Sequence, residues 1–350
     1  MGGQARTVLR SVHRWVSLVL GLPIALIAAS GAAVDYWFEI DALAAPAFYA
    51  GDSAGPPLPL DRLAAAAHRA VPGARIENIF LNLDGRVAII SLTGPWGERL
   101  RDLALGRASG KVLGERWQDE ALIERLYGFH TNLLLGDGAR PLVLGLAVVF
   151  LALLASGAVL WWPAPARWRS ALSLRLAAGA RLIDLHAKAG IFSLALTALA
   201  GVTAVMLLLP LQSDGSAPAP LAAARPSPVQ PLQSLLDAAQ AASPGWQAVN
   251  VLGTENADEP LRVILWRPAG LVRREALRIV HVQRATGAVA EPSGTDRHET
   301  ARSLHNGRIG GELGRVAMAI AGLLPLALWI TGALVWWRKA KTQRGHGVTG

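Results

Sequence analysis

Four long apolar runs dominate the pattern of hydrophobic and polar positions along the chain. They cover residues 15–34, 142–162, 189–211 and 316–337, and none contains Asp, Glu, Lys or Arg. A helix that crosses the hydrocarbon core of a bilayer needs about 20 predominantly apolar residues. Buried helices of soluble proteins are seldom this long without a charge. The pattern therefore predicts an α-helical membrane protein with four transmembrane helices.

Basic residues beside these runs predict the orientation. They stand before the first run, between the second and third, and after the fourth: Arg6, Arg10, Arg14, Arg167, Arg169, Arg175, Arg181, Lys188, Arg338, Lys339, Lys341 and Arg344. Short flanks rich in Lys and Arg stay in the cytoplasm. We therefore expect a multi-pass protein of the bacterial inner membrane, with both termini cytoplasmic and the two long segments periplasmic.

Each long segment has the pattern of a small α+β module, with one helix followed by strands. In the first, a helix is expected at 60–71 and strands at 76–83, 86–92, 100–105 and 111–113. In the second, a helix is expected at 232–242 and strands at 246–252, 261–266 and 277–282. Residues 213–228, rich in Pro, Ala and Ser, are interpreted as a linker before the second module.

These elements define eight consecutive parts of the chain. They are a flank with the first span (1–40), module 1 (41–128), the second span (129–163), a cytoplasmic loop (164–188), the third span (189–212), a linker with module 2 (213–303), the fourth span (304–338) and a cytoplasmic tail (339–350).

The second half of the chain repeats the first. Residues 129–132 (Phe-His-Thr-Asn) match residues 304–307 (Leu-His-Asn-Gly) at an offset of 175. The same offset relates Gly136 to Gly311, Arg140 to Arg315, Gly157 to Gly332, and Trp161–Trp162 to Trp336–Trp337. We interpret the chain as two tandem-duplicated halves, each made of a span, a module and a second span.

Composition removes several classes of function. The chain has no cysteine, which excludes disulfides, iron–sulfur clusters and a cysteine nucleophile. Its formal net charge of +9 comes with 52% hydrophobic and only 17% charged residues. Because the basic residues cluster beside the apolar runs, they suit a lipid bilayer, and no nucleic-acid partner is expected.

Four histidines are the candidate ligands. His13 and His186 precede the first and third runs, on the predicted cytoplasmic side, while His130 and His305 precede the second and fourth runs, on the periplasmic side. Neutral imidazole is a good axial ligand for haem iron. If the halves pack about a pseudo-two-fold axis, each face of the membrane receives one histidine pair. We predict two b-type haems, since no Cys-x-x-Cys-His motif exists for covalent attachment.

Other interpretations of these residues stay open. A histidine at a membrane interface can simply be a polar cap, and His130 with His305 can bind zinc or copper. His298, seven residues before His305, is a possible extra ligand. The basic neighbours of the histidines can pair with haem propionates or with lipid headgroups: Arg14, Lys188, Arg140 and Arg315.

Two signatures in the chain resemble the PepSY-associated membrane proteins. One is His13-Arg14-Trp15, and the other is the repeated run from Phe129-His130 to Trp161-Trp162-Pro163 and from Leu304-His305-Asn306-Gly307 to Trp336-Trp337-Arg338. That family includes iron-regulated inner-membrane proteins and ferric-siderophore reductases. The resemblance implies PepSY-like modules and a di-haem protein that delivers electrons to the periplasm.

We therefore predict electron transfer to a periplasmic ferric complex such as a ferric siderophore, which would release its iron. Some relatives carry a fused flavoprotein domain, but the tail after Arg338 is too short for one, so we expect quinol or a cytoplasmic reductase as electron donor. The alternative is a non-catalytic interaction protein that binds a peptide, a peptidase or an uptake partner. A transporter is disfavoured, because no charged residue lies within a span.

Overall fold

The computed structural model describes residues 2–51, 55–81, 85–162, 168, 182–209, 230–255, 259–268, 270, 276–290 and 297–346. These residues form two compact units, one of long helices and one built around a sheet. The predicted linker at 213–228 lies outside the described residues, as do Arg167, Arg169, Arg175 and Arg181.

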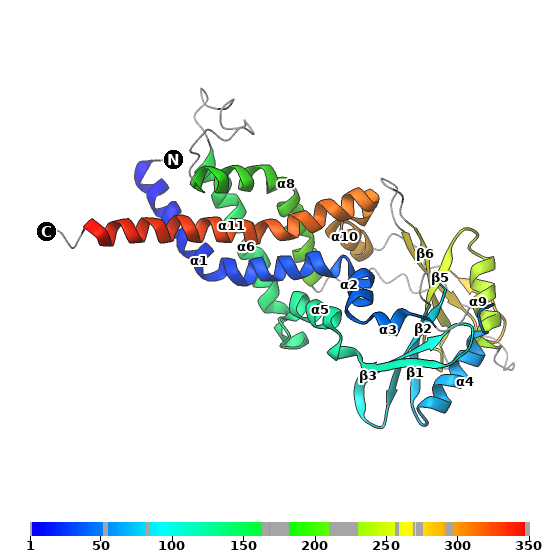
Figure 1. Ribbon diagram of the computed structural model, residues 1–350. Helices are drawn as coiled ribbons and strands as arrows, with labels where there is room; N and C mark the ends of the chain where they lie inside the picture. The colour runs from blue at the N-terminus through cyan, green and yellow to red at the C-terminus, as the bar shows by residue number, and fades with distance from the viewer. Residues whose placement is uncertain are drawn as a thin grey trace. The chain divides into compact units, whose positions relative to one another are not determined.

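The helical unit contains the predicted membrane spans (Figure 1). Its helices are α1 (Gly3–Val34), α5 (Leu122–Asn132), α6 (Arg140–Trp161), α8 (Leu182–Leu208), α10 (Arg297–His305) and α11 (Gly311–His346), with short 3-10 turns at Asp137–Ala139 and Arg308–Gly310. Among the described residues, four helical stretches are long and apolar enough to cross a membrane: Gly3–Val34, Leu122–Trp161, Leu182–Leu208 and Arg308–Lys341.

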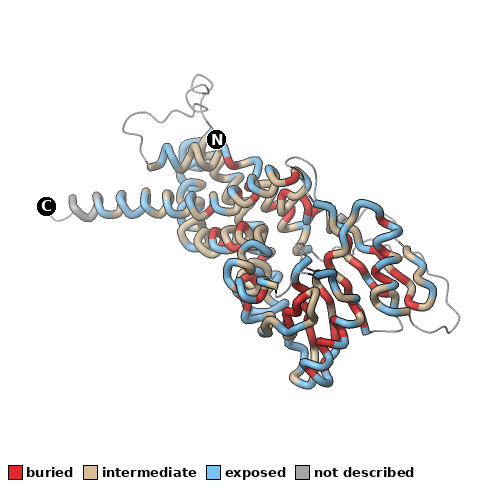
Figure 2. The backbone as a smooth tube through the Cα atoms, turned by 45° about the vertical axis from the view of Figure 1, so that its right-hand side comes forward, coloured by how far each residue is buried: buried red, intermediate tan, exposed pale blue. Residues whose placement is uncertain are grey.

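The long helices pack in a closed ring of neighbours. Helix α1 packs against α11 and α6, and α8 packs against α6 and α11. Helices α1 and α8 therefore lie diagonally opposite each other, as do α6 and α11. Figure 2 shows buried residues concentrated in the sheet unit, while much of the long helices is exposed or half-buried. Apolar side chains such as Val19 and Val148 are more than half exposed, as expected of helices that face lipid.

The sheet unit is one continuous antiparallel sheet. Its strands are β1 (Arg75–Leu81), β2 (Val87–Gly94), β3 (Gly97–Gly106), β4 (Val112–Trp117), β5 (Gln247–Leu252), β6 (Leu261–Arg267), β7 (Ala276–Val282) and β8 (Val289–Ala290). They are ordered β4-β3-β2-β1-β5-β6-β7-β8. Helices α4 (Leu60–Ala70) and α9 (Leu232–Ala241) precede the two sets of four strands. The predicted order of one helix followed by strands is thus observed in both segments.

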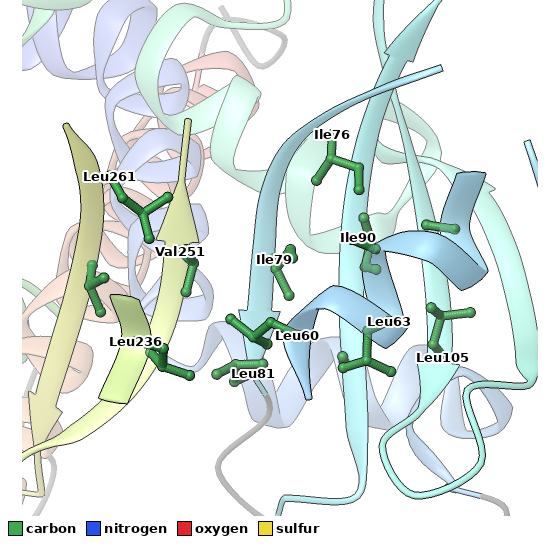
Figure 3. Close-up of a cluster of buried hydrophobic side chains, with 14 of the residues drawn as sticks. Leu60, Leu63, Ile76, Ile79, Leu81, Ile90, Leu105, Leu236, Val251 and Leu261 are labelled. Carbon is green, nitrogen blue, oxygen red and sulfur yellow. The ribbon is translucent and has the colours of Figure 1, made fainter. Parts of the chain in front are cut away.

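The hydrophobic core lies between one face of the sheet and helices α4 and α9. Alternate residues of the strands point into it, as their burial patterns indicate. Figure 3 shows side chains from both halves of the sheet in this cluster, with Leu60 and Leu63 from α4 and Leu236 from α9. The core is therefore shared by both segments of the chain.

The two predicted modules join along strands β1 and β5, which pair antiparallel. Ile79 lies opposite Val251, with Asn78 opposite Leu252 and Phe80 opposite Asn250. Each strand would otherwise be an exposed sheet edge, and pairing the two edges satisfies their backbone groups. The expectation of two modules is refined here, because neither set of strands stands alone.

The N-termini of α4 and α9 exchange their caps. Both helices follow a proline, Pro59 or Pro231, that supplies no side-chain cap. The Asp61 carboxylate accepts hydrogen bonds from the backbone N–H groups of Leu232 (2.9 Å) and Gln233 (3.1 Å). In return, Gln233 Oε1 accepts one from the N–H of Leu60 (3.0 Å). Each helix thus satisfies free N–H groups of the other.

The opposite face of the first four strands is covered by α2 (Trp37–Ala44) and α3 (Pro46–Tyr49). Here the Arg116 guanidinium donates two hydrogen bonds to the buried Asp41 carboxylate, at 2.9 and 2.6 Å. The Tyr49 hydroxyl also donates to Asp41. Burial and this carboxylate raise the pKa of Tyr49, so that the phenol remains a donor.

Candidate functional site

The four candidate histidines all lie in the helical unit, on two diagonal pairs of helices. His13 is on α1 and His186 on the diagonally opposite α8. His130 is on α5, which leads into α6, and His305 ends α10, which leads into α11. Each predicted pair therefore takes one side chain from each side of the bundle axis.

His130 and His305 are brought together. Their ring centroids lie 6.0 Å apart, and the ring planes are inclined at 38°. His13 and His186 lie on the diagonally opposite helices α1 and α8. The structure thus gives a direct ring-to-ring contact for His130 with His305.

The Nδ1 atoms of His13 and His186 contact hydroxyl groups on the neighbouring spans. His13 Nδ1 lies 2.7 Å from Ser156 Oγ, and His186 Nδ1 lies 3.0 Å from Thr331 Oγ1. Ser156 donates its own proton to the carbonyl of Leu153 at 2.9 Å, and Thr331 donates to a carbonyl of its helix in the same way. A hydroxyl that donates to its helix carbonyl can accept a hydrogen bond from the imidazole N–H.

The other two histidines follow the same rule. His130 Nδ1 lies 2.8 Å from the backbone carbonyl of Ile27, which can only accept. His305 Nδ1 lies 3.0 Å from Thr203 Oγ1, and the Thr203 hydroxyl donates to the carbonyl of Leu199 at 2.7 Å. All four contacts are consistent with a proton on Nδ1 of the ring.

This arrangement prepares the opposite ring nitrogen of each histidine for a metal. With Nδ1 protonated and held, Nε2 of a neutral imidazole carries a free lone pair. Histidines that bind metals almost always donate their other N–H to a carbonyl, hydroxyl or carboxylate, which fixes ring orientation and tautomer. Four histidines oriented alike are more than polar caps require.

Three glycines lie against the imidazoles. A Cβ atom on Gly31 would lie 2.5 Å from Cε1 of His130, so a side chain there would clash with the ring. Cβ atoms on Gly157 and Gly332 would each lie 3.4 Å from Cε1, of His13 and His186 respectively, which is ordinary van der Waals contact.

The residues present fit a bis-histidine haem. An iron bound by Nε2 at about 2 Å lies about 3 Å from each imidazole centre, so two axial imidazoles have centres about 6 Å apart. The His130–His305 spacing matches that value. Across the described part of the chain, no three His, Cys, Asp or Glu side chains converge as a metal site.

The structure gives contacts for two of the basic residues that can pair with propionates or headgroups. Arg315 donates Nε and a terminal nitrogen to the backbone carbonyl of Asp35, at 3.0 and 2.7 Å, and so binds the end of α1. The Arg14 guanidinium lies 5.2 Å from the ring centroid of Trp15. Arg140 is exposed at the start of α6, Lys188 follows His186 on α8, and His298 lies within α10.

The sequence analysis did not identify the residues that orient the histidines. Ser156, Thr331 and Thr203 are small hydroxyl residues inside apolar runs, and Ile27 acts through its backbone. One signal was available, since Ser156 and Thr331 stand 175 positions apart, the offset of the repeat. A hydroxyl retained at matching places in two apolar runs suggests a specific hydrogen bond.

The family described as the PepSY-associated TM region matches residues 10–339, which is nearly the whole chain. A search among curated proteins found no match.

Proposed function

This chain belongs to the family of the PepSY-associated TM region, and from that premise we propose that it is a haem-containing electron-transfer protein. We propose that it reduces a periplasmic ferric complex, such as a ferric siderophore, from the bacterial inner membrane. The observation that carries the proposal is the shared geometry of His13, His186, His130 and His305, each with Nδ1–H held and Nε2 free.

His13 with His186 would hold one b-type haem, and His130 with His305 the other. Such a group, with imidazoles on both sides, passes single electrons and has no open position for oxygen. The chain's own contribution is orientation. Ser156, Thr331, Thr203 and the Ile27 carbonyl fix the rings, and the apolar spans exclude water from them.

The direction of electron flow follows from the proposed topology. The basic flanks support cytoplasmic termini, which puts His13 and His186 on the donor side and the sheet unit in the periplasm. Quinol or a cytoplasmic reductase would supply the electrons. One electron converts ferric to ferrous iron, whose lower charge binds hard oxygen ligands less strongly, so the chelate releases it.

We further propose that the two halves arose by duplication and pack about a pseudo-two-fold axis. The residue pairs Ser156 with Thr331 and Gly157 with Gly332 play equal parts in the two halves, at the same offset. In the sheet, β1 and β5 lie antiparallel at the centre of the strand order, as equivalent strands on a two-fold axis must.

The test is haem content and reduction in matched variants of the full chain. His130→Ala should lose one haem, keep the other and abolish reduction of a periplasmic ferric chelate. His68→Ala is the control, because His68 lies in the sheet unit and pairs with Glu255 at 2.7 Å. Full haem content in His130→Ala would refute the ligand assignment. Haem-free wild-type protein from haem-replete cells would favour the interaction protein instead.

A further inference from the structure

Trp329 is a large, half-buried aromatic side chain of α11 that the histidine network does not use. Its Cδ1 lies 2.9 Å from the position that a Cβ atom would take on Gly21 of α1. The indole ring of α11 is therefore seated directly on the backbone of its neighbour. A glycine at position 21 is what leaves room for it.

This contact lies between the two histidine pairs along the membrane normal. Gly21 is eight residues after His13 and six before Ile27, whose carbonyl accepts from His130. At about 1.5 Å per residue, these separations along the helix are about 12 and 9 Å. The Trp329–Gly21 contact is thus placed in the middle of α1, between the levels of the two pairs.

The direction of the side chain agrees with that position. On α11, Thr331 contacts His186, and it lies only two residues beyond Trp329. Side chains on a helix lean toward its N-terminus, which for α11 is the His305 end. The indole therefore extends from the level of the His13–His186 pair toward the His130–His305 pair.

Trp329 is also a departure from the internal repeat. The residue 175 positions earlier is Leu154, an aliphatic side chain. The Trp329 indole nitrogen is buried and makes no hydrogen bond to any described residue. Leaving such a donor unpaired is unfavourable. A leucine has no such donor, so packing alone does not explain a tryptophan here.

We infer that Trp329 is the aromatic bridge through which electrons pass between the two histidine pairs. The inference rests on the proposed function and adds a residue to it. With haem bound, the iron held by His13 and His186 would be oxidised by one electron, and the iron held by His130 and His305 would be reduced by it. No bond forms or breaks in Trp329, and its ring undergoes no net oxidation.

The physical basis is the polarisable π-system of the indole. A large flat ring fills the space between the two sites with delocalised electrons, whereas an aliphatic side chain offers only saturated bonds. Phenylalanine at this position would keep a π-system without the N–H group. Leucine would restore the residue of the first half and remove the ring.

The test uses the full chain loaded with haem in proteoliposomes, in Trp329→Phe, Trp329→Leu and, as control, Trp336→Leu. Trp336 lies near the end of α11, packed edge-on against Trp15 with centroids 6.3 Å apart. Dithionite added on one side starts a single turnover without ferric substrate. Haem absorbance then reports how fast reduction passes from the first site to the second, and redox titration gives both midpoint potentials.

We expect Trp329→Leu to slow this internal step by about tenfold or more, with Trp329→Phe intermediate and Trp336→Leu unchanged. Haem content and potentials should stay as in the wild type. An unchanged rate in Trp329→Leu with both haems bound would overturn the bridge while leaving the proposed function intact. Wild-type protein without haem would overturn both. If Trp329→Leu loses haem, Trp329→Met replaces it in the experiment, because methionine fills a similar space without a ring. An unchanged rate in Trp329→Met with both haems bound would then overturn the bridge.

Discussion

Nδ1 of His13 lies 2.7 Å from Oγ of Ser156, and this hydrogen bond links α1 to α6. The Ser156 hydroxyl donates its own hydrogen bond to the Leu153 carbonyl, so it can accept one from His13 Nδ1 and leave Nε2 of that ring free. Thr331 on α11 has the same role for His186 on the neighbouring helix α8. The residues that orient His13 and His186 thus lie on helices other than those that carry the histidines.

The first prediction concerns this hydroxyl. Ser156→Ala should weaken haem binding at the His13–His186 pair by about 10–100-fold, the usual effect of losing an orienting partner of a metal ligand. Binding at the other pair should not change. Haem titration of apo-protein measures both sites. Thr197→Ala is the control, because Thr197 donates to carbonyls of its own helix and contacts no histidine. Equal effects of the two variants would rule out the orienting role.

The second prediction concerns Gly31, which lies against the imidazole ring of His130. Gly31→Ala would put a methyl group 2.5 Å from Cε1 of His130, so the ring must move. We expect selective loss of the haem between His130 and His305, seen as half the haem content. Gly145→Ala is the matched control in a span, since nothing lies within 4 Å of its added Cβ. Full occupancy in Gly31→Ala would contradict the geometry of this pair.

The third prediction concerns the exchanged caps of α4 and α9. Asp61→Ala removes the acceptor for two backbone N–H groups and should destabilise the start of α9 by about 1 kcal/mol. Hydrogen exchange at Leu232 and Gln233 should accelerate by about fivefold, as that free energy implies. Gln233→Ala should affect the start of α4 instead. Unaltered amide hydrogen exchange at the N-termini of both α4 and α9 would show that these caps do not stabilise the helices.

The fourth prediction concerns the ion pair beneath α2. The Asp41 side chain is 1% exposed and receives two hydrogen bonds from Arg116. Asp41→Ala leaves a buried guanidinium with Asp102 as its remaining partner, at 3.7 Å, and should cost about 3–5 kcal/mol. Chemical unfolding of the sheet unit measures this. Arg75→Ala, which breaks an exposed pair with Glu77, should have little effect.

Much of the fold could be predicted from local patterns. The four apolar runs gave the spans, and the helix-then-strands order was confirmed at α4 with β1 to β4 and at α9 with β5 to β8. The pairing of β1 with β5 could not be predicted. Ile79 and Val251 are about half the chain length apart, and their alternating pattern fits any neighbouring strand equally well.

The candidate site was predictable only in part. His130 and His305 stood out because the repeat set them at matching places. Their hydrogen-bond partners did not, because Ile27 acts through a carbonyl that every residue has, and Thr203 sits on another helix. Which face of a span meets which neighbour depends on packing, and apolar side chains on all sides hide it from the sequence.

The most direct test of the account is the absorption spectrum of the purified protein, oxidised and then reduced with dithionite, with haem counted per chain. We expect a low-spin bis-histidine spectrum, two b-type haems per chain, and one haem in either His130→Ala or His186→Ala. A wild-type protein without haem, purified from cells that make it in excess, would contradict the electron-transfer function.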